Sequence, residues 1–436
     1  MSNSEGNDSN DCLSPATPCK TINKGRDKLR NGFPDHLYLK RGDVFRQQTL
    51  DRFPSGRSNE EPLVIAFYGN TGPRPKLENH SQSGIGRGDI RYVHVIGLEF
   101  SSYRMDPKHP EYTGSGSANI VMINNHSDFL FEDNKFHYAE VVAHDYTDQN
   151  NIAYQPRNLT FRRNIWTGHY TTTSSYHQNS RPSNMYAKVE GYLALIENVF
   201  DYGGWHPSIQ GAGGNMYNHN IYLQGGALAD ITLKGNIITR GSSHGAQMRS
   251  GGLAEDNFFA RNSIGLLVGY SVKLLPDGTR AHAINNVVSE GESMVKGVDP
   301  CSGGNLCTQA LWGLEFDLRG GNLDWRAHGN IVSMLGPSEQ WRSVYNNLNA
   351  SPLINLNNAA VQSSNNIAWK WSLNPAATDN NYPDPDRTLA DYNAHLGGPR
   401  SFEAFMDAVT NRPLQTWDQR YSAYAINNYI RAGFGR

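Results

Sequence analysis

The chain has 436 residues, and its composition differs from that of a helical, disordered or membrane-spanning protein. Its 43 glycines, 11% aromatic residues and only 18% charged residues indicate a turn-rich β protein. The formal net charge of -2 provides no global field that would attract nucleic acid or an anionic membrane, so we expect neither as a partner. No apolar run approaches the roughly 20 residues that a membrane-spanning helix needs.

The first 37 residues are predicted to form an N-terminal capping segment. Within it, 21–29 has the pattern of a short helix that ends near Asn31 and Gly32. A β-helix exposes unpaired backbone and apolar core at its end, and a cap would cover both. The segments 35–39 and 41–45 are predicted to be the first strands.

Four cysteines fall into two close pairs, Cys12 with Cys19 and Cys301 with Cys307. This spacing fits two local disulfides, which form in oxidising compartments. The competing interpretation is a zinc site, but zinc-binding pairs are usually closer in sequence and no histidine lies at a suitable spacing. We therefore expect a secreted protein. No signal peptide is visible, and we interpret the chain as a mature form with an added Met.

A short phrase recurs between residues 131 and 368, in which polar or small residues precede an Asn and an apolar residue follows it. The eight instances centre on Asn134, Asn164, Asn198, Asn236, Asn257, Asn286, Asn330 and Asn366. Their spacings run from 21 to 44 residues, and the shortest is about one coil of a parallel β-helix. The longer spacings fit one coil plus loops on one side.

A recurring Asn has a physical role in such a fold. Successive coils stack about 4.8 Å apart, so an Asn at one corner can bind the Asn or the backbone of the coils above and below. Asn also tolerates the left-handed backbone of a tight corner. Each Asn here precedes residues that favour strands, unlike an Asn in an ordinary loop. We predict that the eight residues stack at one corner.

The residues from 384 onward are predicted to form a short helical flank. Ser401 is a suitable N-cap for a helix over 402–409, and 417–431 has apolar groups every three or four residues. The sequence thus predicts an all-β protein, built on a single-stranded right-handed parallel β-helix. The expected parts are the N-terminal cap at 1–37, the β-helix domain at 38–383 and the C-terminal helical flank at 384–436.

The segments Pro18-Cys-Lys-Thr-Ile22 and Leu37-Tyr-Leu-Lys-Arg-Gly-Asp43 resemble the first coil of bacterial right-handed β-helix proteins, many of them carbohydrate-active. With the Asn phrase, the resemblance covers roughly residues 10–370. This architecture resembles that of the β-helix polysaccharide lyases, and alginate is our first choice of polymer by resemblance to the β-helix alginate lyases, not by any residue. The resemblance implies β-elimination at a uronic acid of an acidic polysaccharide. We expect the enzyme to be a monomer.

Two stretches, 219–226 and 244–252, align with each other. The aligned pairs are His219 with His244, Tyr222 with Gln247, and Gln224 with Arg249. Because strand side chains alternate between faces, the four expected to point outward are Tyr222, Gln224, Gln247 and Arg249. Counting back from the Asn corner adds two more residues, Lys188 and Glu190. The predicted ladder has one column of Lys188, Tyr222 and Gln247, and a second column of Glu190, Gln224 and Arg249. The next coil, 265–269, has no outward polar group, so we expect the ladder to end there.

Long polar insertions at 168–184 and 203–218 are expected to wall the same coils. Arg181 lies in the first insertion, whereas Trp205 and His206 lie in the second, where an aromatic face could stack on a sugar ring. A single outward polar residue on a strand is ordinary, so the prediction rests on finding a Lys, a Tyr, an Arg and two His together on one face. The predicted substrate-binding residues are His219, Gln224, Gln247, Glu190, His206, Trp205 and Arg181.

β-Elimination at a uronic acid needs a cation on the substrate carboxylate, a base for the C5 proton and an acid for the leaving O4. Arg249 is the expected cation, because a guanidinium binds a carboxylate in a bidentate way. Lys188 is the expected base, since a neighbouring cation lowers the pKa of a lysine. Tyr222 or His244 is the expected acid. The division of base and acid among these residues and His219 stays open.

The sequence supports no cofactor. An Asp-rich cluster of the kind that binds Ca²⁺ in pectate lyases is not visible, which disfavours pectate and leaves Ca²⁺ open but without support from the sequence. A uronan epimerase would use nearly the same site, but the Asp-Pro-His phrase of those enzymes is absent from the ladder region. A β-helix glycoside hydrolase would need two carboxylic acids about 5–9.5 Å apart, and Glu190 is the only acid of the ladder. A carbohydrate-binding adhesin would need stacking aromatics but not Lys, Tyr and Arg together.

Overall fold

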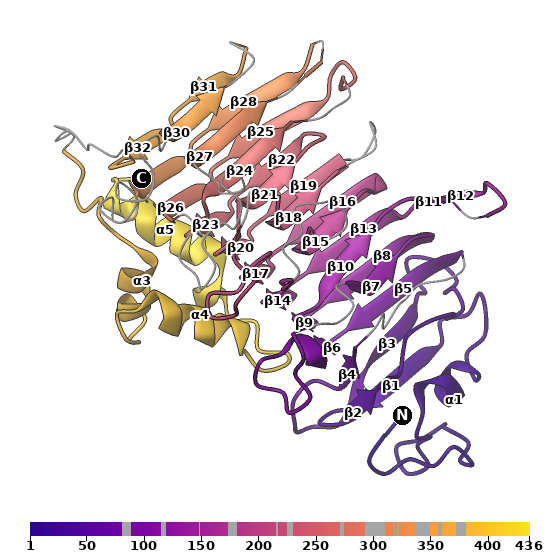
Figure 1. Ribbon diagram of the computed structural model, residues 1–436. Coiled ribbons are helices and arrows are strands. Elements are labelled where there is room, and N and C mark those ends of the chain that lie inside the picture. Colours follow the sequence, from indigo (N-terminus) through magenta and orange to yellow (C-terminus); the bar gives the residue numbers. More distant parts are fainter. Residues whose placement is uncertain are drawn as a thin grey trace.

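The computed structural model describes residues 1–80, 89–114, 119–147, 149–172, 181–214, 217–224, 230–270, 274–292, 310–317, 319–320, 322–335, 349–355, 360–371 and 381–436. The described strands form three long parallel sheets of 11, 8 and 11 strands, wound into a parallel β-helix (Figure 1). The structure confirms the all-β class and the parallel β-helix that the Asn repeat predicts.

Each coil contributes one strand to sheet A, one to sheet B and then, in most coils, one to sheet C. Sheet A contains β1 (His36–Lys40), β3 (Leu63–Tyr68), β5 (Ile90–Ile96), β8 (His126–Glu132), β13 (Arg157–Arg162), β16 (Glu190–Ile196), β19 (Asp230–Lys234), β22 (Gly252–Glu255), β25 (Arg280–Ile284), β28 (Asp324–His328) and β31 (Gln362–Ser364). Sheet B contains β2 (Val44–Arg46), β4 (Lys76–Asn79), β6 (Glu99–Ser102), β9 (Lys135–His137), β14 (Ile165–Thr167), β17 (Val199–Asp201), β20 (Ile237–Thr239), β23 (Phe258–Ala260), β26 (Val287–Gly291), β29 (Ile331–Leu335) and β32 (Ile367–Trp369).

Sheet C contains β7 (Asn119–Ile123), β10 (Glu140–Ala143), β15 (Ser183–Ala187), β18 (His219–Leu223), β21 (His244–Met248), β24 (Ile264–Gly269), β27 (Ala310–Asp317) and β30 (Asn349–Asn355). A hairpin of β11 (Tyr146–Thr147) and β12 (Ala153–Tyr154) leaves the winding between β10 and β13. It projects from the body of the β-helix at the right of Figure 1. A short 3-10 helix, η1 (Tyr103–Met105), follows β6.

The eight Asn residues stack at the corner between sheets A and B, as predicted. The Oδ1 of Asn164 accepts hydrogen bonds from the backbone N–H and the side chain of Asn134, at 2.9 and 3.0 Å. Its own Nδ2 donates to the carbonyl of Phe131 in the preceding coil, at 2.9 Å. The same bonds repeat from coil to coil, so the amides are buried without leaving their polar groups unpaired.

The left-handed residue of this corner is the one before each Asn, which corrects the role predicted for the Asn itself. The φ angle is 53° at Asp133, 58° at Arg163 and 65° at Gly235. The division has a physical reason. The Asn side chain must point into the coil to reach its neighbours, so the reversal of the chain falls on the residue before it.

Aromatic rings stack inside the coils because equivalent positions of successive coils lie directly above one another. Phe136, Trp166 and Phe200 occupy the same position in β9, β14 and β17. Their ring centroids are 4.6 and 4.3 Å apart, and the planes are nearly parallel. The apolar residues two positions after the Asn residues, from Phe136 to Val332, thus belong to one continuous core along the axis.

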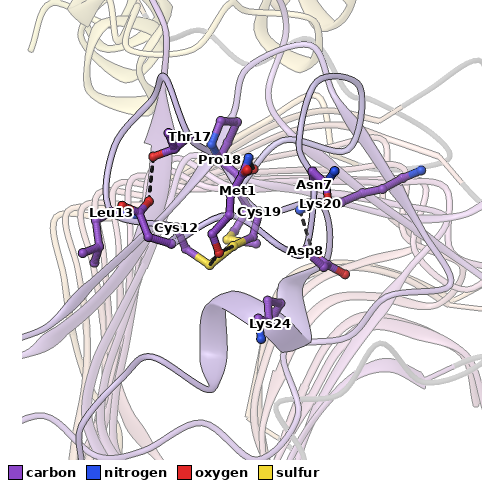
Figure 2. Close-up of a disulfide and its surroundings, with 12 residues drawn as sticks. Met1, Asn7, Asp8, Cys12, Leu13, Thr17, Pro18, Cys19, Lys20 and Lys24 are labelled. Carbon is purple, nitrogen blue, oxygen red and sulfur yellow. Dashed lines mark hydrogen bonds between the residues drawn. A yellow bond between two sulfur atoms is a disulfide. The ribbon is translucent and has the colours of Figure 1, made fainter.

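The N-terminal cap consists of loops and a short helix, α1 (Ile22–Arg26). The helix ends three residues before the predicted end at residue 29. A disulfide between Cys12 and Cys19 closes the loop beside α1 (Figure 2). Asp8 accepts hydrogen bonds from the backbone N–H groups of Lys20 and Thr21, at 2.8 and 2.9 Å. A disulfide across so short a loop stabilises the folded chain by about 2.5 kcal/mol.

One of the two predicted disulfides is thus confirmed. The other predicted pair, Cys301 with Cys307, lies outside the described residues.

The C-terminal flank contains α3 (Leu389–His395), α4 (Phe402–Thr410), the 3-10 helix η2 (Gln419–Tyr421) and α5 (Ala423–Gly433). Ser401 caps α4 as predicted, accepting a hydrogen bond from the Ala404 N–H at 3.2 Å. The helices run along the outer face of sheet B (yellow in Figure 1). They bury an apolar row on that sheet that consists of Ile165, Val199, Ile237, Phe258, Val287, Ile331 and Ile367.

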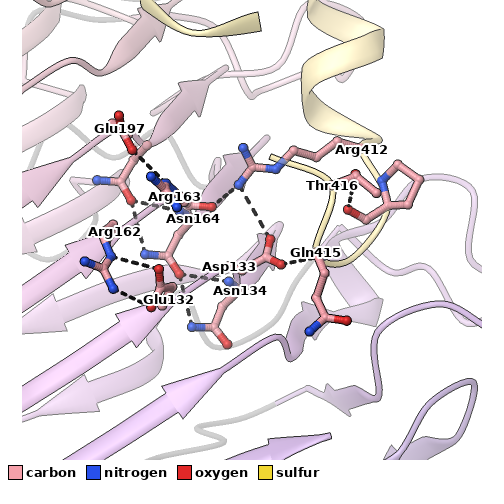
Figure 3. Close-up of polar contacts among 12 residues, drawn as sticks. Glu132, Asp133, Asn134, Arg162, Arg163, Asn164, Glu197, Arg412, Gln415 and Thr416 are labelled. Atoms are coloured by element: carbon pink, nitrogen blue, oxygen red, sulfur yellow. Dashed lines mark hydrogen bonds and ion pairs between the residues drawn. The ribbon is translucent and has the colours of Figure 1, made fainter. Parts of the chain in front are cut away.

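The segment between α4 and α5 fastens this flank to the Asn corner (Figure 3). Arg412 donates to the carbonyl of Arg163, and its guanidinium lies 3.6 Å from the Asp133 carboxylate. The backbone N–H of Gln415 donates to the same carboxylate at 2.8 Å. The flank therefore spans many coils, from the last strands back to the coil of β8 and β9, and it buries sheet B from β14 onward.

A buried histidine is expected to make the fold acid-sensitive. His126 is 1% exposed, and burial lowers its pKa to about 4, whereas in an unfolded chain it titrates near 6.5. Between pH 6.5 and 4 this histidine is protonated in the unfolded state and neutral in the folded state. The free energy of unfolding should therefore fall by up to roughly 3 kcal/mol between pH 6.5 and 4 because of this residue. Urea titrations of the wild type and His126→Phe across this range measure the effect. The same substitution at the exposed His36 should leave the slope unchanged, and equal slopes for all three proteins would refute the assignment.

Candidate functional site on sheet C

The three sheets present different outer faces. Sheet B is covered by the helical flank from β14 to β32. Sheet A carries charges that pair across neighbouring strands, such as Arg157 with Glu190 at 2.6 Å and Lys234 with Glu255 at 2.6 Å. Sheet C carries polar side chains that are buried, among them His219 at 5% exposure. Buried polar groups cost folding free energy unless they are satisfied, and they concentrate where chemistry needs them. We therefore place the candidate site on the outer face of sheet C.

Strand pairing arranges the outward side chains of sheet C in columns. The middle column contains Tyr186, Tyr222, Gln247, Leu267 and Glu315. The column at the strand ends contains Lys188, Gln224 and Arg249, as the backbone bonds from Lys188 to Ala143, from Gln224 to Ala187 and from Arg249 to Leu223 show. At the strand starts, His219 lies beside His244, as predicted, with ring centroids 4.7 Å apart.

The predicted register of the first coil is wrong by two residues. Tyr186, not Lys188, lies beside Tyr222, and Lys188 lies beside Gln224. The count from the Asn corner assumed that every coil has the same length between sheet C and that corner. β16 is three residues longer than β22, and the turn before it is one residue shorter. The count for this coil therefore falls two residues too far along the chain.

Glu190 does not belong to the site, which corrects its predicted place in the ladder. It begins β16 of sheet A, where its carboxylate pairs with Arg157. The turn at Lys188 and Val189 carries the chain from sheet C to sheet A. The chain thus leaves the face of the site two residues before Glu190.

Two predicted substrate-binding residues, Trp205 and His206, also lie away from the outer face of sheet C. Trp205 is 5% exposed, and its indole N–H donates to the carbonyl of Arg240 at 2.7 Å, so its ring is not open to a sugar. His206 is half-buried against Tyr138 and Tyr170, at the corner between sheets B and C. Arg181 is exposed beside the site, where its positive charge contributes to lowering the pKa of His219.

Tyr222 lies at the centre of the site. Its phenol oxygen accepts hydrogen bonds from the Arg249 guanidinium and from the Gln224 amide. Its ring contacts His219 and Tyr186, with centroids 4.9 and 5.5 Å away. A phenol oxygen has two lone pairs, and here both face donors. The hydroxyl proton of Tyr222 is therefore left to donate elsewhere, and the guanidinium can stabilise negative charge on the oxygen once that proton is given up.

The two histidines are neutral at pH 7. Burial lowers the pKa of His219 to about 4, and it holds the pKa of His244 well below the usual value. The Nδ1 of His244 lies 2.9 Å from the Ser243 hydroxyl, and the Gln247 side chain hydrogen-bonds to His219. The Nε2 of His244 has no hydrogen-bond partner within the described part of the chain. A neutral imidazole with a ring nitrogen to spare can accept a proton.

The two cations at the strand ends have different partners. Lys188 forms an ion pair with Asp145, from the loop that leads into β11, so the neighbouring cation expected from the sequence is replaced by a carboxylate. Arg249 donates through Nε to the carbonyl of Tyr270 at 2.9 Å, and its guanidinium has no carboxylate partner in the described ranges. An unpaired guanidinium beside a phenol suits an anionic ligand group.

The structure adds residues that the sequence reasoning missed. Tyr186 could have been found, because it lies two residues before Lys188, near the end of β15. Glu140 begins β10, accepts a hydrogen bond from the Ser183 N–H at 3.2 Å, and has its pKa raised well above the usual value by burial. The polar ladder also resumes beyond β24 at Glu315 and Asp317, where the sequence analysis expected none. No short-range sequence signal links these residues to Tyr222.

The described residues contain no group of three or more His, Cys, Asp or Glu that could hold a metal ion. Nor does any helix among them have the length and apolarity to cross a membrane.

No known protein-family profile matches the chain, and no curated protein matches it. Among solved structures it is similar to a rhamnogalacturonan lyase, with a TM-score of 0.39 and 11% identity over 72% of this chain and 86% of the other. It is also similar to a GH136 lacto-N-biosidase from Eubacterium ramulus, with a TM-score of 0.36 and 14% identity over 84% of this chain and 67% of the other. The activity of this chain has to be argued from its own site.

Proposed function

We propose that the chain is a carbohydrate-active enzyme, a polysaccharide lyase that cleaves a uronic-acid polymer by β-elimination. The observation that supports this most is the environment of the Tyr222 hydroxyl, which accepts from Arg249 and Gln224 beside the neutral His219. Cations for a carboxylate and neutral groups that can exchange protons thus meet on one face. A row of side chains repeated every 4.8 Å or so along a sheet suits a linear polymer.

The side chains divide the reaction as follows. Arg249 binds the substrate carboxylate, with Lys188 and Arg181 as further cations near it, and this withdraws electron density from C5. A histidine of the pair His219–His244 accepts the C5 proton. The electron pair of that bond forms the C4–C5 double bond, and the C4–O4 bond breaks. Tyr222 gives its proton to O4, and the guanidinium beside it stabilises the phenolate that remains.

In this proposal Lys188, the base predicted from the sequence, serves as a cation held by Asp145. Arg249 keeps the role that the sequence analysis assigned to it.

Alginate is the polymer we propose first, by resemblance to the β-helix alginate lyases and not on the evidence of any residue. We also propose that the enzyme is secreted. The disulfide between Cys12 and Cys19 is of the kind that persists in oxidising surroundings.

A panel of polymers tests the activity. Purified protein is incubated with polymannuronate, polyguluronate, polygalacturonate and a rhamnogalacturonan, and ultraviolet absorbance follows the new unsaturated uronate. We expect absorbance to rise with at least one polymer and to stay flat with a neutral polysaccharide. A folded protein that produces no unsaturated uronate from any acidic polymer would refute the proposed function.

A further inference from the structure

A second group of reactive side chains lies on the same face, two coils beyond Arg249. Glu315 and Asp317 of β27 are in register with Leu267 and Gly269 of β24. Since Leu267 pairs in turn with Gln247, both carboxyls face the same side as Tyr222 and Arg249. Two strand spacings, about 10 Å, separate the two groups.

Glu315 is buried without the partners that a structural carboxyl would have. It is 2% exposed, and its Oε2 has no hydrogen-bond partner among the residues that the structure describes. The indole Nε1 of Trp312, on the same strand, also lacks a partner in that part of the chain. A buried polar atom without a partner lowers the stability of the fold, so two of them on one strand indicate a function.

The two carboxyls also differ in protonation. Burial, together with the charge of Asp317, raises the pKa of Glu315 to about 8, so Glu315 carries a proton at neutral pH. The Asp317 carboxylate lies 4.0 Å from the Arg319 guanidinium. One strand thus presents a proton donor and a proton acceptor as a pair.

The spacing of the pair suits one kind of chemistry. Alternate residues of a strand lie about 6.7 Å apart on the same face. Glycoside hydrolases place their two carboxyls about 5–5.5 Å apart when they retain the anomeric configuration and about 6.5–9.5 Å apart when they invert it. The Cα atoms of Glu315 and Asp317 are spaced by this repeat, and side chains that leave one face of a strand in parallel keep about the same separation, so the pair suits the inverting arrangement.

We propose that Glu315 and Asp317 form a second reaction centre, which hydrolyses a glycosidic bond with inversion. Glu315 gives its proton to the glycosidic oxygen as the bond between C1 and that oxygen breaks. Asp317 takes a proton from water, whose oxygen forms the new bond to C1. A proton passing from Asp317 back to Glu315 restores the pair, and water is the only co-reactant. The half-buried ring of Trp312 lies on the same strand beside this centre.

The proposal does not depend on the lyase chemistry at Tyr222, and one experiment separates the two. The protein is incubated with acidic and neutral polysaccharides in H₂¹⁸O, and mass spectrometry analyses the products. Hydrolysis places ¹⁸O at a saturated reducing end, whereas β-elimination gives an unsaturated, ultraviolet-absorbing end without ¹⁸O. We expect labelled ends from the wild type, and a rate about 10²–10⁴-fold lower from Glu315→Gln and from Asp317→Asn.

The control is Glu255→Gln, which changes a carboxyl of sheet A that pairs with Lys234 and lies on another face. It should form labelled ends at the wild-type rate. Thermal melting must show that each variant is folded, and the two substitutions at β27 provide independent tests of one centre. No labelled ends from folded wild-type protein with any polymer would overturn the proposal, as would undiminished labelling by both Glu315→Gln and Asp317→Asn.

Discussion

Replacing Tyr222 with Phe is expected to lower kcat on a uronate polymer by about 10²–10⁴-fold, the usual loss when a proton-transfer group is removed. The phenyl ring should keep the contacts with His219 and Tyr186, so the fold should be preserved. Only the oxygen that accepts from Arg249 and Gln224 is lost. Initial rates of ultraviolet absorbance, together with circular dichroism, measure the effect.

Two further variants show which residue carries the proton. Gln224→Ala removes a donor to the same oxygen but no exchangeable acid, and it should change kcat by less than about tenfold. If Lys188 were the base, as the sequence predicts, Lys188→Ala would reduce kcat as strongly as Tyr222→Phe does. From its ion pair with Asp145 we instead expect a raised KM with kcat within about tenfold. A folded Tyr222→Phe protein with wild-type turnover would contradict the role of Tyr222.

Replacing Asn236 with Ala is expected to lower the free energy of unfolding by roughly 3–6 kcal/mol. Its Oδ1 accepts two hydrogen bonds from Asn198, at 2.9 and 3.0 Å. Its Nδ2 donates to the carbonyl of Leu195 at 2.8 Å and to Asn257 at 2.9 Å. The substitution leaves several buried groups without partners, at a cost of about 1–3 kcal/mol each. Urea denaturation at pH 7 measures the change.

The end of the ladder is the matched control. Asn366 lies in the last coil of the ladder and is partly exposed, so water can replace the bonds that Asn366→Ala removes. We expect a loss of about 1 kcal/mol there. Equal losses at the two positions would show that the ladder contributes no more in its interior than at its end.

The fold could be predicted because the Asn phrase is local. A ladder residue is needed once in every coil, whatever the length of the loops between, and the residues around it need only a turn and a short strand. The helix at Ser401 was predictable for the same reason, since an N-cap and its apolar spacing lie within ten residues of one another. The interior stacks of like side chains follow from the same repetition.

The site could be predicted only in part, because its contacts join different coils. The pairing of His219 with His244 was found from two similar stretches of sequence. The partner of Lys188 lies 43 residues away, in a loop that nothing in the strand pattern identifies. The place of Tyr186 beside Tyr222 depends on the exact length of the path from sheet C to the Asn corner, which varies between coils.

By itself, the sequence determined the β-helix, its Asn corner and the presence of a polar face on one sheet, because each follows from patterns shorter than one coil. Only the tertiary structure decided which residues share that face. A shift of two residues kept Lys188 on the face but in another column, and Glu190 lay beyond the turn on another sheet. Which side chains become neighbours in successive coils depends on the lengths of the loops between them. Those lengths vary without a periodic pattern, so the sequence does not reveal them.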